Sequence, residues 1–531
     1  MDSDTIVFLV IAGFVVFIVG SWIFQWKSGY LKMKYQEGYD SVARPALAQR
    51  IAAGDKPWGA PLAGSTFGGA YFLDTNQLAK AGMAGHHNDL LGSAPFLGAH
   101  ETKTNSGVQS ARIYYPGDDH LITIAPTRKG KGVSHVIPNL IGYDGSVFVI
   151  DVKGENSRKT AEWRKSQNQD VFVFQPFEPS GNTHQFNPLD FIRPGPDAYD
   201  DAIILADMIV IPSDKHDEKY WTSEARNVIA GFLLHVALDE TNPKRRNLAE
   251  VRRLLMLGKA DFFDTLYEMA GSSREAVKHT ANSLISAEEK LRSNILATVK
   301  NQTEFLQSER VTNAMTRSDW KFEQLKLQPT SIYIVIPPDK LETHNRVLRL
   351  MVGIAVAAMS RVEQKPQLPV LFLLDEFTQL GRMDKIANGV KVLASYGIRM
   401  WFFVQDLPSV RDVYGHDQAL SFFANCGCKS FFGVSDFETA QHLSSQMGDM
   451  TVIAESQGHS NREGGFLNTD VSRNYSTSGR PLLTPEEILN LPPERQIILV
   501  SGQKPILAWR EKYFEMATLE KVVSAYRMSA A

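Results

Sequence analysis

The sequence predicts an α/β fold, in which a largely parallel, doubly wound sheet is interrupted by a block of helices and preceded by an apolar segment. Three observations predict it. Short apolar runs alternate with helical patterns from Arg112 onward, the strand signal nearly vanishes between residues 188 and 327, and residues 5–26 carry no charge. The chain of 531 residues is 43% hydrophobic and 22% charged, an ordinary globular composition that excludes a disordered or fibrous protein.

The net charge and the number of cysteines exclude two further kinds of protein. The formal net charge of −3 excludes a protein that coats nucleic acid through its overall charge, so any contact with nucleic acid must be local. The two cysteines, Cys426 and Cys428, exclude a disulfide framework and indicate a cytosolic globular part. They alternate along an expected strand, which predicts two buried thiols on the same face.

Residues 1–30 are expected to anchor the chain in a membrane. At about 1.5 Å per residue, the uncharged run Thr5–Trp26 is long enough to cross a hydrocarbon layer of ~30 Å. A signal peptide would begin with basic residues and end at a small-residue cleavage site, whereas this run begins after Asp4 and ends at Trp26. Basic residues follow from Lys27 onward, so we expect the bulk of the chain in the cytoplasm.

The remainder divides into an α/β domain and an insertion. Eight apolar runs are expected to form the strands: Leu121–Ala125, Ser146–Val152, Val171–Gln175, Ser331–Ile336, Val370–Leu374, Arg399–Val404, Lys429–Gly433 and Gln496–Val500. Helical spacing predicts an all-α domain over residues 191–327, which splits the α/β domain into 112–190 and 328–515. Residues 31–111 are expected to be a connector, and 516–531 a C-terminal helix or tail. The polar stretch 454–479 is expected to be a mobile loop.

The first expected strand leads into a loop rich in glycine and basic residues and then into a helical pattern, the arrangement of a phosphate-binding loop. The loop residues are Thr127, Arg128, Lys129, Gly130, Lys131, Gly132 and Val133. Backbone N–H groups and the helix N-terminus would bind nucleotide phosphates, with Lys131 reaching the β and γ oxygens. The alternative is a turn that binds nothing.

Two positions of this loop depart from the usual pattern. Ala125 replaces the first glycine, and Gly132 replaces the Ser or Thr that usually binds magnesium. Ser134 is a poor substitute because it lies roughly 200° further round a helix.

Two acids directly follow the continuous apolar run 369–374. Asp375 and Glu376 fall at the carboxyl end of an expected strand, where ligands collect in open α/β sheets. Asp375 would hold Mg²⁺, and Glu376 would polarise the attacking water; the alternative is a pair of solvated loop acids. Gln405, at the end of the next expected strand, would sense the γ-phosphate or orient the water, unless it only caps the following helix. These residues predict a hydrolase that uses ATP and Mg²⁺.

Asp151 and Lys153 follow a further expected strand at the same edge. They could serve the ligand or form a structural ion pair, and the sequence leaves both possibilities open.

Further motifs occur in order between residues 112 and 512: Thr127–Ser134 with Ile137–Leu140, Ile150–Asn156, Phe186–Asp190, Leu374–Phe377, Gln405–Leu407 with Val413–Gly415, and Arg480–Thr484. Their order and spacing resemble the TraG/TraD-like coupling proteins of type IV secretion systems. In that family glycine often follows the loop lysine, as Gly132 does here.

The resemblance implies a RecA-like P-loop ATPase domain with an inserted all-α domain and one N-terminal transmembrane helix, assembled as a homo-hexamer at the bacterial inner membrane. The partners it implies are a relaxase–single-stranded DNA complex, secreted effector proteins and the inner-membrane components of a type IV secretion channel. The expected function is an ATP-driven motor that moves this cargo into the channel.

Two features of the chain differ from the family. Relatives commonly have two membrane spans, whereas one is visible here. They also commonly carry an arginine just before a Tyr-Gly pair, where this chain has Ser395. Such an arginine completes the active site of a neighbouring subunit; Lys391, Arg399 or Arg128 would have to supply the charge instead.

Two other functions compete with the motor. One is a double-stranded DNA translocase of the chromosome-segregation type, which usually carries long linkers and a winged-helix end. The other is a nucleotide-gated docking receptor without motor activity, which would have no need of Lys131, Asp375 and Glu376 together.

Other signals are expected to be structural. Four histidines lack the spacing of metal ligands and are expected in polar loops: His86, His87, His100 and His120. The basic triplet Lys244–Arg246 and the basic pair Arg252–Arg253 are expected on a solvated helix face, with contact to DNA or an acidic partner as the alternative. Tyr220 and Trp221 are expected in the core.

Overall fold

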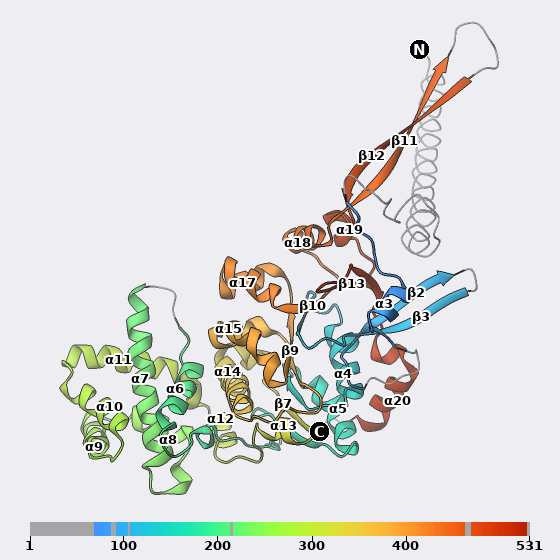
Figure 1. The fold of residues 1–531 in the computed structure, drawn as a ribbon. Coiled ribbons are helices and arrows are strands. Elements are labelled where there is room, and N and C mark those ends of the chain that lie inside the picture. Colours follow the sequence, from blue (N-terminus) through green and yellow to red (C-terminus); the bar gives the residue numbers. More distant parts are fainter. Residues whose placement is uncertain (1–67, 86–91, 105–106, 213–215, 462–468, 528–531) are drawn as a thin grey trace, which may run out of the picture.

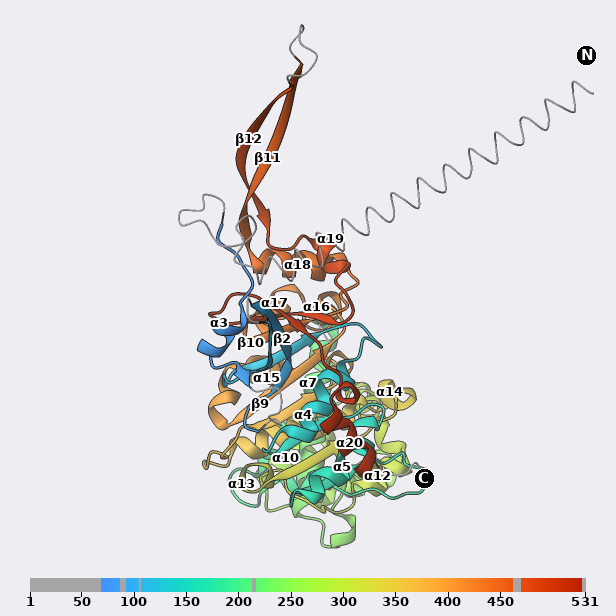
Figure 2. The same ribbon diagram turned by 90° about the vertical axis from the view of Figure 1, so that its right-hand side faces the viewer.

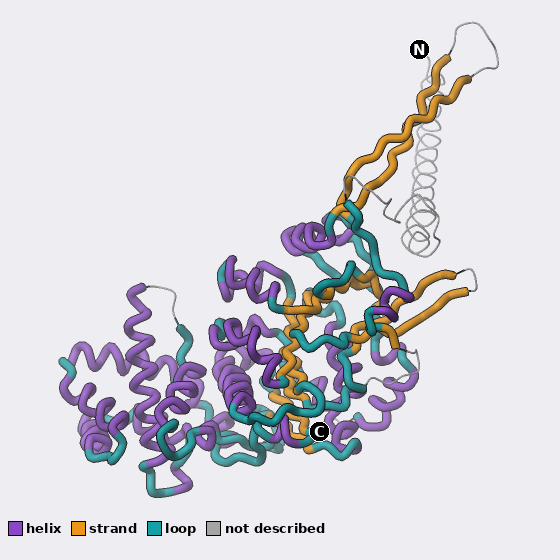
Figure 3. The backbone as a smooth tube through the Cα atoms, in the orientation of Figure 1, coloured by secondary structure: helices purple, strands orange, loops and turns teal. Residues whose placement is uncertain are grey.

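The computed structural model describes residues 68–85, 92–104, 107–212, 216–461 and 469–527 (Figure 1). The anchor expected over residues 1–30 lies outside these ranges, as do His86 and His87. Among the described residues, no helix combines the length and the apolar character needed to cross a bilayer. Strands lie at the centre of the body and helices flank them (Figure 3).

One mixed sheet of twelve strands organises the described chain, and its central part is parallel. The parallel strands lie in the order β10 (Cys426–Phe431), β4 (His120–Ile124), β9 (Ile398–Val404), β8 (Val370–Leu374), β5 (Val147–Ile150), β7 (Thr330–Ile334) and β6 (Asp170–Phe174). Antiparallel strands extend the β10 edge: β13 (Arg495–Val500), β14 (Ile506–Trp509), β2 (Phe96–Thr104), β3 (Gly107–Tyr114) and β1 (Ala84–Gly85). All eight expected strands are present, and the predicted α/β fold is confirmed.

The segment expected to be a connector contributes to this sheet. It contains α3 (Thr75–Lys80) and β1–β3, and β2 pairs with β14. The sequence hid β2 because a glycine interrupts it. Gly98 has φ +146°, and a Cβ there would lie 2.4 Å from the Trp509 carbonyl oxygen, so the close approach of the two strands requires glycine.

Each face of the sheet carries its own apolar core, because successive strand residues point to opposite sides. Leu121 belongs to the core that includes α4 (Ile137–Gly142), whereas Ile122 belongs to the larger core that includes α14 (Pro338–Ser360). The other helices of this domain are α5 (Glu155–Ser166), α15 (Asp384–Leu393), α16 (Leu407–Tyr414), α17 (His416–Ala424), α18 (Phe437–Met447), α19 (Pro485–Leu489) and α20 (Ala517–Tyr526). Thus the C-terminal segment 516–531 contains a helix, α20, which packs against α4 and α5.

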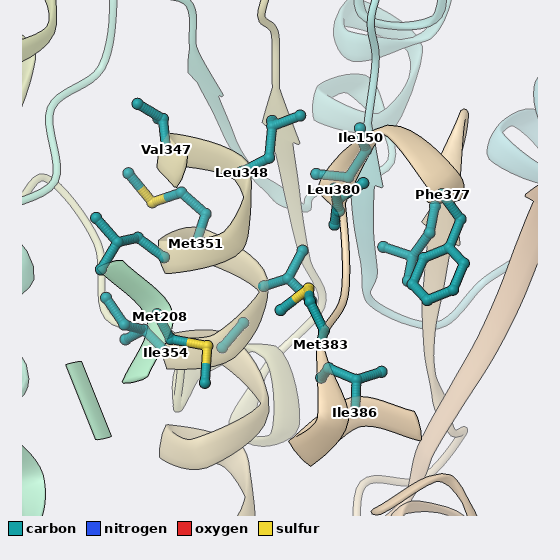
Figure 4. Close-up of a cluster of buried hydrophobic side chains, with 14 of the residues drawn as sticks. Ile150, Met208, Val347, Leu348, Met351, Ile354, Phe377, Leu380, Met383 and Ile386 are labelled. Atoms are coloured by element: carbon teal, nitrogen blue, oxygen red, sulfur yellow. The ribbon is translucent and has the colours of Figure 1, made fainter. Parts of the chain in front are cut away.

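A helical unit lies between β6 and β7 in the sequence, and its helices from α6 to α11 form the left side of Figure 1. Its helices are α6 (Ala198–Ile209), α7 (His216–Leu238), α8 (Leu248–Leu255), α9 (Lys259–Ala270), α10 (Glu275–Ser286), α11 (Glu289–Gln302), α12 (Glu309–Ala314) and α13 (Gln324–Leu327). Helix α6 packs against α14 of the α/β domain. Met208 of α6 lies beside Ile354 of α14 in Figure 4, in an apolar cluster that also contains Val347 and Met351.

The stretch 454–479, expected to be a mobile loop, instead belongs largely to a long hairpin. Strands β11 (Asp449–Asn461) and β12 (Thr469–Pro481) pair antiparallel from Asp449 opposite Pro481 to Asn461 opposite Thr469. The hairpin projects from the body (Figure 2). The expectation failed because a strand that does not pack on a sheet needs no alternation of apolar and polar residues, which is the signal used to recognise strands.

The two cysteines are buried, but they do not share a face. The pairing of β10 with β4 shifts register between Cys426 and Cys428, so that Gly427 forms a bulge. Cys426 therefore lies in the core containing α14 and Cys428 in the core containing α4. Burial raises the pKa of Cys426 to about 12, which makes it an unreactive thiol at neutral pH.

Several smaller expectations are also corrected. His100 and His120 are buried strand residues rather than loop residues, and His120 Nδ1 accepts a hydrogen bond from the Met400 amide at 3.0 Å. Arg252 is buried and donates to the Lys300 carbonyl, whereas Lys244–Arg246 are exposed on a 3₁₀ turn. Tyr220 is 52% exposed, although Trp221 packs against the core.

Candidate nucleotide-binding site

The loop after β4 has the backbone of a tight phosphate-binding turn. Arg128 and Gly130 adopt positive φ values of 63° and 91°, which turn the chain sharply before the helix begins. Thr127, Arg128 and Lys129 are exposed, so their backbone is accessible to a ligand. Lys131 Nζ folds back and donates a hydrogen bond to the carbonyl oxygen of Ala125 at 2.8 Å.

The helix after the loop begins with a π-helical turn, Gly132–Val136, that continues into α4. Such turns are rare and occur frequently at functional sites. Ser134 is buried and donates to the Gly130 carbonyl at 2.8 Å. Its hydroxyl therefore stabilises the loop, in agreement with the expectation that it is a poor magnesium ligand.

His135, in the same turn, ties the loop to three strands. Its Nδ1 accepts a hydrogen bond from Thr123 Oγ1 at 3.2 Å, and its Nε2 donates to the Leu97 carbonyl and to Gln496 Oε1, each at 3.1 Å. Burial lowers the pKa of His135 to about 4, which keeps the ring neutral at physiological pH. The loop rests on a fully buried polar network that the sequence motif did not reveal.

The outer side of the loop is held by residues from two distant segments. Arg510, which follows β14, donates to the Lys129 carbonyl and lies over the Phe432 ring at 4.5 Å. Gly433, at φ +59°, lies against the Lys129 side chain, and a Cβ there would be 3.0 Å from Lys129 Cδ. No sequence motif marks Arg510 or Gly433 as part of the site, although Gly433 ends an expected strand at the ligand edge of the sheet.

Glu376, the second of the two acids after β8, meets the loop lysine. Glu376 Oε1 lies 3.8 Å from Lys131 Nζ, and Gln405 Nε2 donates to Glu376 Oε2 at 3.1 Å. The order β4–β9–β8 explains this, because Gln405 follows β9 and thus lies between the other two residues. Asp406, not Gln405, caps α16 through a 2.8 Å hydrogen bond from the Ser409 amide. The structure therefore brings Lys131, Glu376 and Gln405 together.

Asp375 is half-buried beside other carboxylates. Burial raises its pKa to about 7, and the charges of Glu376 and Asp151 add to the rise while Lys131 opposes it. Mg²⁺ commonly takes one or two protein carboxylates and completes its shell with phosphate oxygens and water. No group of three or more His, Cys, Asp or Glu side chains in the described chain is arranged to hold a metal alone. Asp375, in this concentration of negative charge, suits a magnesium ion shared with a nucleotide.

Asp151 has a structural role at the same edge. Its Oδ2 accepts hydrogen bonds from the Ser157 amide at 2.8 Å and the Ser157 hydroxyl at 2.9 Å, which tie it to the first turn of α5. Lys153 is exposed. The sequence left open whether Asp151 forms an ion pair with Lys153. The structure shows that its carboxylate instead binds the first turn of α5.

Arg399 lies at the wrong edge of the sheet to reach a nucleotide. It is the second residue of β9, at the end opposite Gln405, and its side chain is 3% exposed. Its guanidinium donates to the Gly117 carbonyl at 2.5 Å and to Asp118 at 3.2 Å. Of the three cations considered as substitutes for the family arginine, Arg399 is excluded by this burial. Arg128 is exposed on the loop itself, and the side chain of Lys391 lies outside the description.

Comparison with known proteins places the chain beside proteins of DNA transfer. The family model described as type IV secretory system conjugative DNA transfer matches residues 70–531. The conjugal transfer protein TraG of Escherichia coli is 30% identical over 437 residues, which cover 76% of this chain and 68% of TraG. VirD4 of Rhizobium rhizogenes is 27% identical over 409 residues, covering 76% of this chain and 60% of VirD4.

A solved structure shares the fold. The plasmid coupling protein TrwB, in complex with the ATP analogue ADPNP, superposes with a TM-score of 0.63 at 16% sequence identity. The superposition covers 86% of this chain and 97% of the TrwB chain.

Proposed function

The chain belongs to the type IV secretory system family of conjugative DNA-transfer proteins, and on this premise we propose that it is a coupling ATPase. It binds ATP with Mg²⁺ at the loop containing Lys131, and it uses hydrolysis to drive a relaxase–single-stranded DNA complex, protein effectors or both into a secretion channel. The TrwB structure with an ATP analogue supports nucleotide binding by this fold.

The observation that carries the proposal is the convergence of three segments on one carboxylate. Lys131 and Gln405 reach the two oxygens of Glu376 at 3.8 and 3.1 Å. The Glu376 side chain is 20% exposed, so a ligand can reach it and displace Lys131. A docking receptor without motor activity would not need a carboxylate held between the loop lysine and an amide.

The residues divide the chemistry among them. When phosphates bind along the loop amides, Lys131 exchanges Glu376 and the Ala125 carbonyl for the β and γ oxygens. Glu376, held by Gln405, then accepts the proton of the attacking water. Mg²⁺ on Asp375 would neutralise charge on the phosphates, and its binding favours the ionised carboxylate.

Two substitutions test the proposal in full-length protein. Lys131→Ala should weaken ATP binding, because it removes the cation that contacts the β and γ oxygens. Glu376→Gln should keep ATP binding but lower the hydrolysis rate by ~10²–10⁴-fold, the usual effect of losing a general base. Both should abolish DNA transfer in a mating assay.

Lys165→Ala is the matched control, since Lys165 is an exposed lysine in the last turn of α5 and is not among the predicted site residues. It should hydrolyse ATP and transfer DNA like the wild type. Normal transfer by Lys131→Ala or Glu376→Gln would refute the motor function.

The proposal extends to the assembly. We propose that residues 1–30 anchor the chain in the inner membrane, that subunits form a homo-hexamer, and that the helical unit formed by α6–α13 receives the cargo. The apolar sequence of residues 5–26 and the family membership support these points.

A further inference from the structure

Helix α14 contacts two parts of the molecule: the helical unit, and residues 377–383, which follow Glu376 and are called the catalytic segment below. One arginine of α14, Arg349, makes both contacts. Arg349 is 2% exposed. Its guanidinium donates to the Met208 carbonyl at 3.2 Å, to the Leu380 carbonyl at 3.2 Å and to the Arg382 carbonyl at 2.5 Å. The planar fork of a guanidinium suits this arrangement, because its N–H groups point in several fixed directions.

The carbonyls on one side belong to the segment that follows Glu376. Glu376, at φ +50°, begins the 3₁₀ turn Phe377–Leu380. Gly381, at φ +69°, turns the chain between Leu380 and Arg382, so that both carbonyls face the same guanidinium. The position of this segment determines the direction from which Glu376 enters the site.

The carbonyl on the other side belongs to the last turn of α6. Met208 precedes Ile209, the final residue of that helix, so Arg349 meets carbonyls at its negative end. Arg346, one turn earlier on α14, donates to the Ile209 carbonyl at 3.2 Å and to Gln302 at 3.1 Å. Both partners of Arg346 therefore belong to the helical unit, whereas Arg349 bonds to the helical unit and to the catalytic segment.

Packing links the hydrogen bond of Arg349 to Met208 with its hydrogen bonds to the catalytic segment. In Figure 4, Met208 of α6, Met351 of α14, and Leu380 and Met383 of the catalytic segment belong to one buried apolar cluster. A displacement of the end of α6 would carry the guanidinium with it, because buried polar groups are costly to leave unpaired.

We propose that Arg349 is a positioning residue that couples α6 of the helical unit to Glu376. The geometry of the catalytic carboxylate then depends on where α6 lies, and a ligand bound to the helical unit changes the hydrolysis rate through this arginine. This inference rests on the hydrolysis of ATP proposed above.

The test compares Arg349→Gln with Arg346→Gln in the full-length chain. Arg349→Gln should lower kcat by ~10- to 100-fold with little change in KM, since misplacing a catalytic group affects turnover more than binding. Arg346→Gln should keep kcat within about twofold of the wild type. Arg349→Lys should recover part of the loss, because an ammonium can contact one element but not span both.

Hydrogen exchange gives a readout that does not need catalysis. Arg349→Gln should speed exchange in residues 377–383 and 206–211, whereas Arg346→Gln should affect only 206–211. Wild-type kcat and wild-type exchange in Arg349→Gln, or equal effects of the two variants, would overturn the coupling. If Arg349→Gln does not fold, Arg349→Lys decides the same question. If the wild type hydrolyses no ATP, the proposed function fails while the exchange data still decide the coupling.

Discussion

At the scale of single residues, the phosphate-binding loop depends on side chains outside its motif. Arg510 holds the Lys129 carbonyl, and His135 ties the following turn to Thr123, Leu97 and Gln496. Trp401 Nε1 donates to Thr123 Oγ1 at 2.9 Å, which directs the threonine hydroxyl toward His135 Nδ1. The network is satisfied by one tautomer of a neutral histidine, with the proton on Nε2.

This network predicts a loss of stability in acid. Because the pKa of His135 falls from 6.5 to about 4 on folding, the unfolded chain binds the extra proton between these pH values. The free energy of unfolding should therefore decrease as the pH falls from about 6.5 to 4, by about 1.4 kcal/mol per unit from this group. Denaturant unfolding measured across this range should show a steeper pH dependence for the wild type than for His135→Gln.

His279→Gln is the control, because the side chain of His279 is 78% exposed and pairs with Glu275 on its own helix. Its pH dependence should match the wild type. Parallel curves for the wild type and His135→Gln would show that His135 is not held neutral.

At the scale of elements, α14 is the helix that the α/β domain and the helical unit share. Its apolar side chains pack in the cluster of Figure 4, and its arginines hold α6 near both ends. Arg361, at the C-terminus of α14, donates to Asp201 in the first turns of α6, and its guanidinium lies 3.7 Å from the Phe191 ring centroid. Arg346 and Arg349 meet the other end. Helix α6 is therefore fixed along α14 by contacts at its beginning and at its end.

Close packing of α14 against the end of α6 depends on a glycine, which gives a prediction for Gly353→Ala. A Cβ on Gly353 would lie 2.2 Å from Met208 Sδ and 2.5 Å from Met208 Cγ. The helix propensity of alanine, worth about 1 kcal/mol, opposes an overpacking cost of roughly 1–3 kcal/mol, so we expect a net loss of stability. Thermal unfolding should show a lower Tm for Gly353→Ala.

The double mutant Gly353→Ala with Met208→Ala identifies the cause. Removing the methionine side chain makes room for the new methyl group, so Gly353→Ala should cost less in the Met208→Ala background. The same cost in both backgrounds would mean that the two helices do not touch at this position.

At the scale of the whole molecule, the proposed mechanism depends on the cations that reach the acids Asp375 and Glu376. In the part of the chain that the structure describes, Glu376 pairs with Lys131, and no arginine bonds to Asp375 or Glu376. Arg399 is buried at the other edge of the sheet. A cation that stabilises the transition state can be worth roughly 10³–10⁵ in rate, so a neighbouring subunit is the natural source.

We therefore expect ATP hydrolysis per subunit to rise with protein concentration. Dilute full-length protein in detergent should turn over slowly, and activity should increase in parallel with the hexamer fraction measured by mass photometry. Activity per subunit that is constant across the transition from monomer to hexamer would show that each site is complete within one chain.

Features that depend on residues close together in the sequence could be predicted from it, whereas features that depend on distant residues could not. The parallel strands were predictable because a buried strand is a continuous local apolar run, and the loop, Asp375, Glu376 and Gln405 followed from their places at strand ends. Strand β2 and the β11–β12 hairpin were missed, because a glycine interrupts the first and the hairpin lacks the alternation of a strand packed on a sheet. The bulge at Gly427 reversed the expected orientation of one cysteine.

The sequence by itself determined which chemical groups line the carboxyl edge of the sheet, since each follows its own strand within a few residues. Only the tertiary structure decided what holds them in place. Arg510 is 381 positions from the carbonyl it binds, Gln496 is 361 positions from His135, and Arg349 is 141 positions from the Met208 carbonyl. Contacts between residues so far apart leave no periodicity in the chain, and they exist only once the sheet and α14 bring their elements together.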